Sequence, residues 1–105
     1  MNVYVFPELA YYEPAWVPLL KSAREWIEQR KCTYVCHALD FAAKAYEGSR
    51  FNGLAEEIEY LIASAIDGCE VVTEWPPASK YAESRSEQRD YRLAWIDHMI
   101  KECQK

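Results

Sequence analysis

Apolar residues recur every three or four positions in four stretches of this chain, and this spacing constrains the fold more than any other feature. It places those residues on one side of an α-helix. Pro14 suits the first turn of the first stretch, and Gly48 and Gly68 follow two of the others, where glycine is common just past a helix end. We therefore predict an all-α fold, a compact bundle of about four helices. The first two helices should share residues 14–47 and meet near residue 30, and the third and fourth should cover 52–67 and 84–103.

The 105 residues are predicted to form one domain, residues 1–105, because a second domain would have no core of its own. Residues 1–13 contain Pro7 and are predicted to be an extended N-terminal arm. The connector 69–77 is ambiguous. Its Val-Val-Thr run favours a strand, whereas the four-residue spacing of Val71 and Trp75 suits a short helix.

The stretch 84–103 carries two apolar stripes rather than one, which predicts a helix buried on two sides. We consider so much apolar surface hard to bury inside one small chain, and therefore expect a homodimer. One stripe consists of Tyr91, Trp95 and Met99, and the other of Leu93, Ile96, Ile100 and Cys103.

The net charge is −5, which argues against direct binding to nucleic acid. Residues 51–78 hold several acidic residues but no lysine or arginine, so the third helix is strongly acidic, and this face alone could imitate a track of phosphates. No apolar run approaches the roughly 20 residues that span a bilayer. The first residues lack the basic and small-residue pattern of a signal peptide. We expect a soluble intracellular protein that does not bind membranes.

The soft metal ligands in the sequence are too scattered to predict a zinc site, because only one pair is closely spaced and two of the cysteines fall on apolar stripes. A cysteine–histidine–carboxylate set could be assembled on paper, but nothing in the sequence brings its members together. We therefore expect no metal, no cofactor, no catalytic residues and no enzymatic activity. The residues considered are Cys32, Cys36, Cys69, Cys103, His37, His98, Asp40 and Asp97.

Two groups of residues are candidates for binding. The first combines aromatic residues of the arm with carboxylates of the acidic region, because tyrosine and tryptophan dominate protein-binding hot spots. An arm folded back as a cover on the bundle is the alternative. The second is an arginine face on the last helix, whose anion would be the chain's own acidic segment, a partner's acidic patch or a nucleotide phosphate. The first group is Tyr4, Phe6, Tyr11 and Tyr12 with Glu56, Glu59 and Glu74, and the second is Arg85, Arg89 and Arg92.

Three blocks of this sequence resemble small uncharacterised helical proteins of tailed phages and prophages. They are the Trp-Ile element at 24–28 followed by Tyr-Val-Cys-His-Ala-Leu-Asp at 34–40, the block from Ile58 to Trp75, and Arg-Leu-Ala-Trp-Ile-Asp-His-Met at 92–99. The resemblance implies a phage origin and no particular reaction.

The leading hypothesis is a phage-encoded, non-enzymatic binding protein. It would act in the host cytoplasm and inhibit or redirect a host protein, such as a bacterial defence factor. The alternatives are a protein that sequesters a nucleotide signal through the arginine face, and a regulatory domain stabilised by zinc through the cysteines.

Overall fold

The computed structural model describes residues 6–29, 34–45, 50–65 and 85–105, and within them the chain is helical apart from the arm and the helix ends. No strand occurs in these ranges, and the predicted all-α bundle with an N-terminal extension is confirmed. Residues 69–77, for which the sequence left a helix and a strand open, lie outside the described ranges. The elements are η1 (Pro14–Trp16), α1 (Val17–Gln29), α2 (Val35–Ala45), α3 (Arg50–Ala65) and α5 (Arg85–Cys103).

The first helix begins where the proline predicts. Glu13 is extended, Pro14 opens a short 3-10 turn, and the backbone N–H of Trp16 donates to the carbonyl of Glu13 over 3.0 Å. Proline suits this position because its missing N–H would have no helical partner there. α1 then continues for 13 residues. The second helix begins at Val35, later than the predicted start near residue 31, and residues 30–33 lie outside the described ranges.

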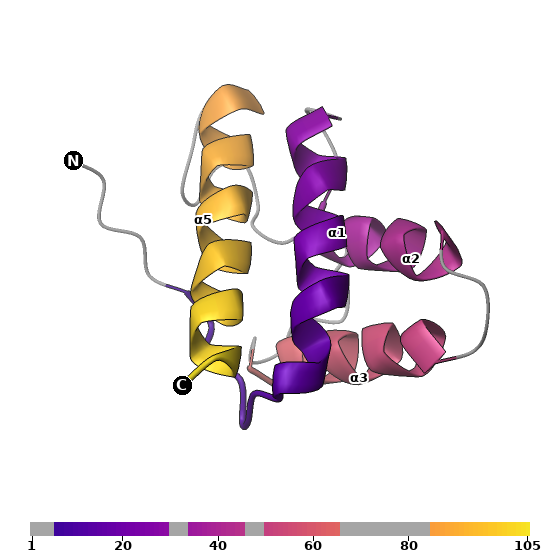
Figure 1. Ribbon diagram of the computed structural model, residues 1–105. Coiled ribbons are helices and arrows are strands. Elements are labelled where there is room, and N and C mark those ends of the chain that lie inside the picture. The colour runs from indigo at the N-terminus through magenta and orange to yellow at the C-terminus, as the bar shows by residue number, and fades with distance from the viewer. Residues whose placement is uncertain (1–5, 30–33, 46–49, 66–84) are drawn as a thin grey trace.

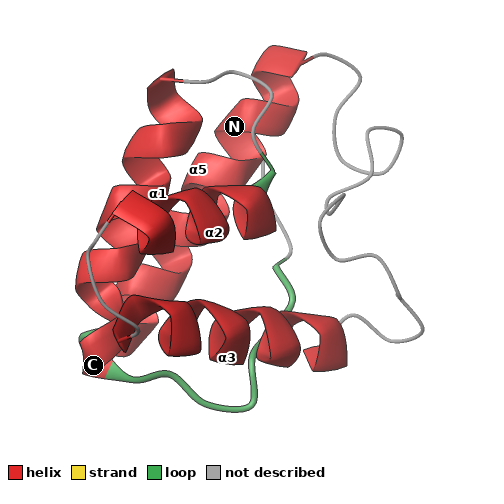
Figure 2. Cartoon of the chain, turned by 90° about the vertical axis from the view of Figure 1, so that its right-hand side faces the viewer, coloured by secondary structure: helices red, strands yellow, loops and turns green. Residues whose placement is uncertain are grey.

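The helices form two crossed pairs. α1 and α5 lie side by side and run in opposite directions, while α2 and α3 form a second antiparallel pair that runs across α1 (Figure 1). Figure 2 shows α2 and α3 next to one another on the side of the molecule that faces the viewer. α1 packs against both α2 and α5, so it is the central helix of the described bundle.

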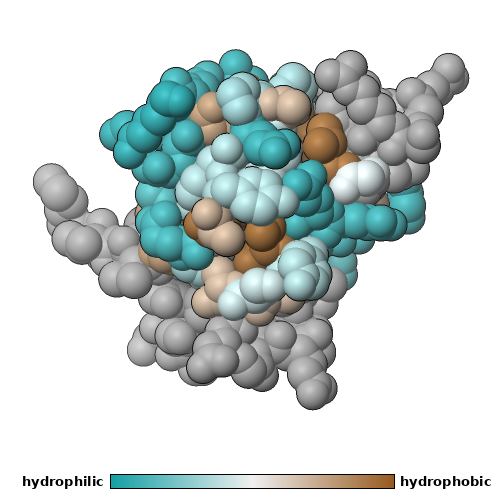
Figure 3. All heavy atoms as spheres, turned by 90° about the horizontal axis from the view of Figure 1, so that it is seen from below, coloured by the Kyte–Doolittle hydropathy of each residue, from teal (hydrophilic) through white to brown (hydrophobic). Residues whose placement is uncertain are grey.

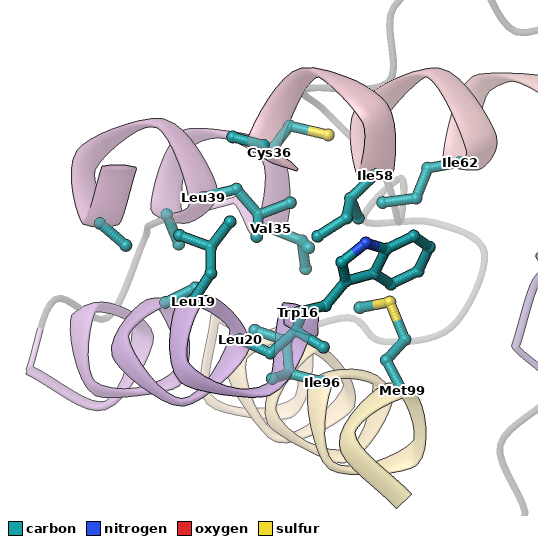
Figure 4. Packing of buried hydrophobic residues seen from close by; sticks show 14 of the residues in the cluster. Trp16, Leu19, Leu20, Val35, Cys36, Leu39, Ile58, Ile62, Ile96 and Met99 are labelled. Carbon is teal, nitrogen blue, oxygen red and sulfur yellow. The ribbon is translucent and has the colours of Figure 1, made fainter. Parts of the chain in front are cut away.

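The core lies where the two pairs meet. Trp16 is fully buried at the start of α1, and its indole ring lies between Ile58 of α3 and Met99 of α5 (Figure 4). Small residues, Ala38 and Ala42 among them, line α2 and allow α1 to approach closely. The remaining buried apolar residues are Leu9, Leu19, Leu20, Ala23, Ile27, Val35, Cys36, Leu39, Ala43, Ala55, Leu61, Ile62, Tyr91, Trp95, Ile96 and Cys103.

Helix α5 is buried on two sides, as its two apolar stripes predict. The first stripe is fully buried, and Ile96 and Cys103 of the second stripe are buried as well. Leu93 and Ile100 are partly buried and pack against the same core. One chain therefore covers most of the apolar surface that led us to expect a homodimer, and the homodimer stays a prediction.

An arginine joins the two long helices at the surface. Arg24 of α1 donates from Nε to Asp97 of α5 over 2.7 Å and from a second nitrogen over 3.3 Å, and it also pairs with Glu28 over 2.8 Å. The hydrogen bond to Asp97 is the main reason that the pKa of Arg24 lies above its ordinary value. This two-point contact links α1 and α5 at the surface, while the buried side chains between them supply most of the packing. No helix in the described ranges is long and apolar enough to cross a membrane.

The central position of α1 makes its core residues the most sensitive to truncation. Leu20 is fully buried, so Leu20→Ala should lower the free energy of unfolding by about 2–5 kcal/mol, through lost burial and the cavity left behind. The neighbouring Lys21 is exposed, and Lys21→Ala should change the free energy of unfolding by about 0.5 kcal/mol or less. Urea denaturation followed by circular dichroism measures both. Equal effects of the two variants would contradict the central role of α1.

Candidate functional site

The outward side of α3 combines carboxylates with a solvent-exposed aromatic ring. Glu56 and Tyr60 are four residues apart, and the side chain of Tyr60 is 72% exposed, the largest value among the exposed large hydrophobic residues of the described ranges. Glu57 lies at the edge of the same side. The opposite side of the helix is buried through Ile58 and Ile62. α3 is thus anchored by one side and presents an acidic, aromatic surface on the other.

The N-terminal arm adds a second tyrosine to this surface. Tyr11 is 44% exposed, and its hydroxyl donates a hydrogen bond to Glu57 of α3. This hydrogen bond to the carboxylate, with smaller effects of burial and of nearby negative charge, raises the pKa of Tyr11 to about 12. The phenol therefore stays protonated at neutral pH. We call the surface formed by Tyr11, Glu56, Glu57 and Tyr60 the α3 face.

Two carboxyl groups meet where α2 lies beside α3. Glu59 is half-buried, and burial together with a hydrogen bond to Asp40 raises its pKa from 4.5 to about 8. The negative charges of Asp40 and Glu56 act in the same direction. Glu59 is therefore largely protonated at neutral pH and donates its proton to the carboxylate of Asp40. We call Asp40 and Glu59 the carboxyl pair.

A row of rings lies on the outward side of α2 and continues onto α1. Phe41 is 41% exposed, and its ring centroid lies 5.3 Å from that of Trp26 of α1 and 6.4 Å from that of His37. His37 is itself exposed and lies 5.9 Å from Tyr34. The α2–α3 side of the molecule therefore carries exposed rings on both helices, with the carboxyl pair at the contact between them.

The surface seen from below, at the end where α3 and the C-terminus lie, is mostly hydrophilic in its described part (Figure 3). Apolar residues show near the centre of that view and in a few separate places toward its upper edge. The described part of this view therefore shows no broad apolar interface.

Two of the predicted arm residues hold the arm against α5. Phe6 stacks on His98 with centroids 5.1 Å apart and also contacts Tyr91 at 5.3 Å. The hydroxyl of Tyr12 accepts a hydrogen bond from the backbone N–H of Leu9 over 3.2 Å. Both rings are partly buried against the core, so these residues behave as the cover that we set out as the alternative for the arm.

Glu8 completes this attachment. One of its carboxylate oxygens lies 3.1 Å from Nε2 of His98, and the other accepts a hydrogen bond from the hydroxyl of Tyr12 over 3.1 Å. Burial is the main reason that the pKa of Tyr12 rises to about 12, so this hydroxyl keeps its proton. The arm therefore contacts α5 through Phe6, Glu8 and Tyr12, while the neighbouring Tyr11 faces α3.

The predicted arginine face is divided by the structure. Arg92 is only 1% exposed, and its guanidinium carbon lies 4.3 Å from the centroid of the Tyr34 ring. Arg89 lies 3.9 Å from the carboxylate of Asp90. The side chain of Arg85 lies outside the described residues. Arg92 is therefore part of the interior packing, which favours internal pairing for this residue, while an anion site at Arg85 and Arg89 stays a prediction.

The described cysteines are buried in the core. Burial raises the pKa of the Cys103 thiol, which keeps it protonated and unreactive, and Cys36 is buried on α2. Within the described ranges no three His, Cys, Asp or Glu side chains are arranged to hold a metal ion. Cys32 and Cys69 lie outside these ranges, as do the predicted binding residues Tyr4 and Glu74.

Sequence reasoning missed Tyr60, Phe41 and the role of Asp40. A usable signal for Tyr60 was present, because this residue stands apart from the apolar stripe of its helix and lies one turn after Glu56. A tyrosine on the polar side of an amphipathic helix is a candidate anchor for a partner, because tyrosine is enriched among hot-spot residues. No comparable signal pairs Asp40 with Glu59, since their contact depends on how α2 packs against α3.

No family model matches this chain, and no similarity to a curated protein or to a solved structure was found. The functional argument therefore depends on the residues and their arrangement.

Replacing Glu59 with glutamine tests the shared proton. Between pH 4.5 and 8 the folded chain keeps a proton that the unfolded chain has released, so this group stabilises the fold less as the pH rises. Glutamine does not ionise and still donates a hydrogen bond to Asp40. We expect Glu59→Gln to match the wild type at about pH 5 and to be more stable than it at about pH 9, in urea denaturation.

Glu25→Gln is the matched control, because Glu25 is an exposed carboxylate on α1. Its effect on the free energy of unfolding should be the same at both pH values. If the difference in free energy of unfolding between Glu59→Gln and the wild type did not grow with pH, the carboxyl pair would share no proton.

Neighbouring tyrosines of the arm should respond differently to truncation. Tyr12 is partly buried on Trp16 and His98, so Tyr12→Ala should lower the free energy of unfolding by about 1–3 kcal/mol. Tyr11→Ala should lower the free energy of unfolding by about 1 kcal/mol or less, because Tyr11 is 44% exposed, although its ring also lies 5.7 Å from that of Trp16. Urea denaturation measures both. A loss of stability in Tyr11→Ala as large as that in Tyr12→Ala would show that Tyr11 too belongs to the cover.

Proposed function

We propose that this chain is a small phage-encoded, non-enzymatic binding protein that inhibits or redirects a host protein, such as a bacterial defence factor, in the host cytoplasm. The phage origin is supported by the resemblance of its Trp-Ile, Cys-x-Ala-Leu and Arg-x-x-Trp-Ile-Asp elements to small phage and prophage proteins. The binding role is supported by the α3 face.

The exposure of Tyr60 is the observation that carries the proposal. A tyrosine left 72% exposed on a helix that buries its other side contributes little to folding. Tyrosine is enriched among hot-spot residues, because its ring supplies a large contact area at a low cost in conformational entropy. Tyr11 adds a second ring, and the carboxylates Glu56 and Glu57 lie around them.

The charge of the α3 face indicates which kind of partner it suits. Carboxylates at the rim of an interface steer a basic partner toward it and raise the association rate, while the aromatic anchors supply most of the affinity. Glu59, one of the carboxylates predicted to bind, contributes less negative charge at neutral pH because it shares its proton with Asp40. The rim charge of the α3 face then comes from Glu56 and Glu57.

The nucleotide alternative is less well supported by the geometry. It requires an outward arginine face, and Arg92 is buried against Tyr34. The zinc alternative depends partly on Cys32 and Cys69, which lie outside the described residues. We therefore keep protein binding as the leading proposal.

Capture from bacterial host lysate with the immobilised chain, followed by mass spectrometry, tests the proposal. Tyr60→Ala should weaken binding of the captured protein by roughly 30-fold, which corresponds to the loss of about 2 kcal/mol at a hot spot. Tyr60→Phe keeps the ring and should retain most of the affinity. Addition of the purified chain should then lower or alter the activity of the captured protein.

Lys101→Ala provides a control at an exposed position on another helix, α5, and should bind as the wild type does. Equal capture by Tyr60→Ala and the wild type, with folding intact by circular dichroism, would show that α3 is not the binding surface. A captured protein whose activity is unchanged would remove the inhibitory part of the proposal.

A further inference from the structure

The α3 face and the end of the arm beside it carry negative charge that no described cation neutralises. Glu56 and Glu57 are consecutive residues of α3, and Glu13 lies close enough to Tyr11 for its charge to act on the hydroxyl of that residue. Within the part of the chain that the structure describes, none of these carboxylates forms an ion pair with a lysine, arginine or histidine. A partner that supplies a cation would therefore meet no competing ion pair here.

Helical geometry places Tyr60 beside two of these carboxylates. Glu56 and Glu57 precede Tyr60 by four and three residues, the spacing at which side chains on one side of an α-helix are neighbours. Helical side chains also lean toward the N-terminus of their helix, so the ring of Tyr60 extends over the turn that holds both carboxylates. Tyr60 is nevertheless 72% exposed. A ligand on this turn can therefore contact the ring and a carboxylate at once.

The outward neighbours on α3 leave this turn open. The next exposed positions are Gly53, about one turn before Glu56, and Ser64, about one turn after Tyr60. A Cβ atom built at Gly53 would meet nothing within 4 Å beyond its chain neighbours and the backbone of its own helix. Both residues are too small to shield the carboxylates or the ring from a partner.

The arm holds one of the carboxylates in place. The hydroxyl of Tyr11 donates a hydrogen bond to one oxygen of Glu57, and the ring of Tyr11 lies 5.7 Å from that of the buried Trp16. A carboxylate has lone pairs for several donors, so this hydrogen bond leaves Glu57 able to accept others. Glu57 therefore loses less conformational freedom when a donor binds than an unattached surface glutamate does.

The combination of a ring and carboxylates suits arginine better than lysine. The guanidinium group is planar, stacks on aromatic rings and donates two parallel hydrogen bonds to a carboxylate, whereas the ammonium group of lysine is a compact, strongly hydrated charge. An apolar partner would cover the carboxylates without pairing them, and burying an unpaired charge is costly. Charge complementarity therefore favours a basic partner.

We propose that the α3 face binds an arginine side chain in a basic segment of the partner protein, with the guanidinium group stacked on Tyr60 and paired with the carboxylates of Glu56 and Glu57. This inference rests on the proposed function, because it names the chemistry of the partner. The carboxylates attract any cation, and the ring of Tyr60 supplies the preference for arginine over lysine.

Nonapeptides of arginine and of lysine are the probes, because they carry equal charge and differ in the cationic group. Isothermal titration calorimetry with the full chain at low ionic strength measures both affinities. The wild type should bind the arginine peptide about two- to fivefold more tightly, the range for a cation over an exposed ring. Tyr60→Phe keeps the ring and should keep this preference. Tyr60→Leu keeps an apolar side chain without the ring and should lose it.

Glu57→Gln tests the carboxylate, with Glu25→Gln as the matched control. Each variant removes one negative charge, but Glu25 is exposed on α1, outside the α3 face. Glutamine still accepts the hydrogen bond from Tyr11, so the contact with the arm is kept. Glu57→Gln should weaken binding of both peptides by up to about fivefold, the upper range for an exposed ion pair. Glu25→Gln should bind them nearly as the wild type does.

Three results would overturn the inference. Equal losses of affinity in Glu57→Gln and Glu25→Gln would show that the peptides respond to net charge alone. An arginine preference that survives in Tyr60→Leu would show that the ring does not contact the guanidinium group. Failure of the wild type to bind the arginine peptide would show that this surface is no site for a basic segment.

The two proposals fail in distinguishable ways. Capture of a host protein that depends on Tyr60, combined with no preference for the arginine peptide, leaves the binding function intact and removes the arginine site. An arginine preference that depends on Tyr60, without any captured host protein, shows that the surface binds arginine and removes the proposed host-protein function.

Discussion

Helix α1 packs against α2 on one side and α5 on the other, and both contacts depend on a single short run of buried residues. Leu19, Leu20, Ala23 and Ile27 are fully buried, and Trp16 fills the space at the start of the helix. α5 lies along α1, where its Trp95, Ile96 and Met99 are buried in the shared core and Asp97 pairs with Arg24 at the surface. α2 and α3 run across α1 instead, so each buries one side and leaves the other to solvent.

That outward side carries groups that a stability argument alone does not explain. Exposed rings at Phe41 and Tyr60 add little to the core, and two carboxyl groups in contact require a proton to avoid repulsion. Features that work against stability tend to occur where a protein binds or reacts. Exposed aromatic rings and carboxylates gathered on the α3 face favour a role in recognition over separate accidents of packing.

Helical periodicity and breaker residues were enough to predict most of the fold. The predicted fourth helix, 84–103, differs by one residue from α5, because its two stripes of large apolar residues match the helical period closely. The start of α2 was placed too early, since residues 30–34 contain no strong breaker and the pattern there is continuous. Proline and glycine mark helix ends in a sequence far better than a change in tertiary packing does.

The candidate site was only partly predictable, because several of its contacts join residues that lie far apart in the sequence. Helical spacing groups Arg92 with Arg85 and Arg89 as a candidate anion site, yet Arg92 is buried and stacks on Tyr34, which lies far from it in the sequence. The contact of Glu59 with Asp40 likewise joins two helices whose relative position no local pattern encodes. Tyr60 is different, since its place on the polar side of a helix is itself a local signal.

The arm connects the fold to the proposed binding surface. Phe6, Glu8 and Tyr12 attach it to α5 through contacts with His98 and the core, and Tyr11 is then held against Glu57 of α3. A tyrosine fixed in this way loses less conformational freedom when a partner binds than one on a loose chain end. The residues that cover the bundle and the residue that faces the partner site thus belong to one short segment. If the α3 face binds a partner as proposed, the attachment of the arm to α5 raises the affinity by holding Tyr11 in place before the partner arrives.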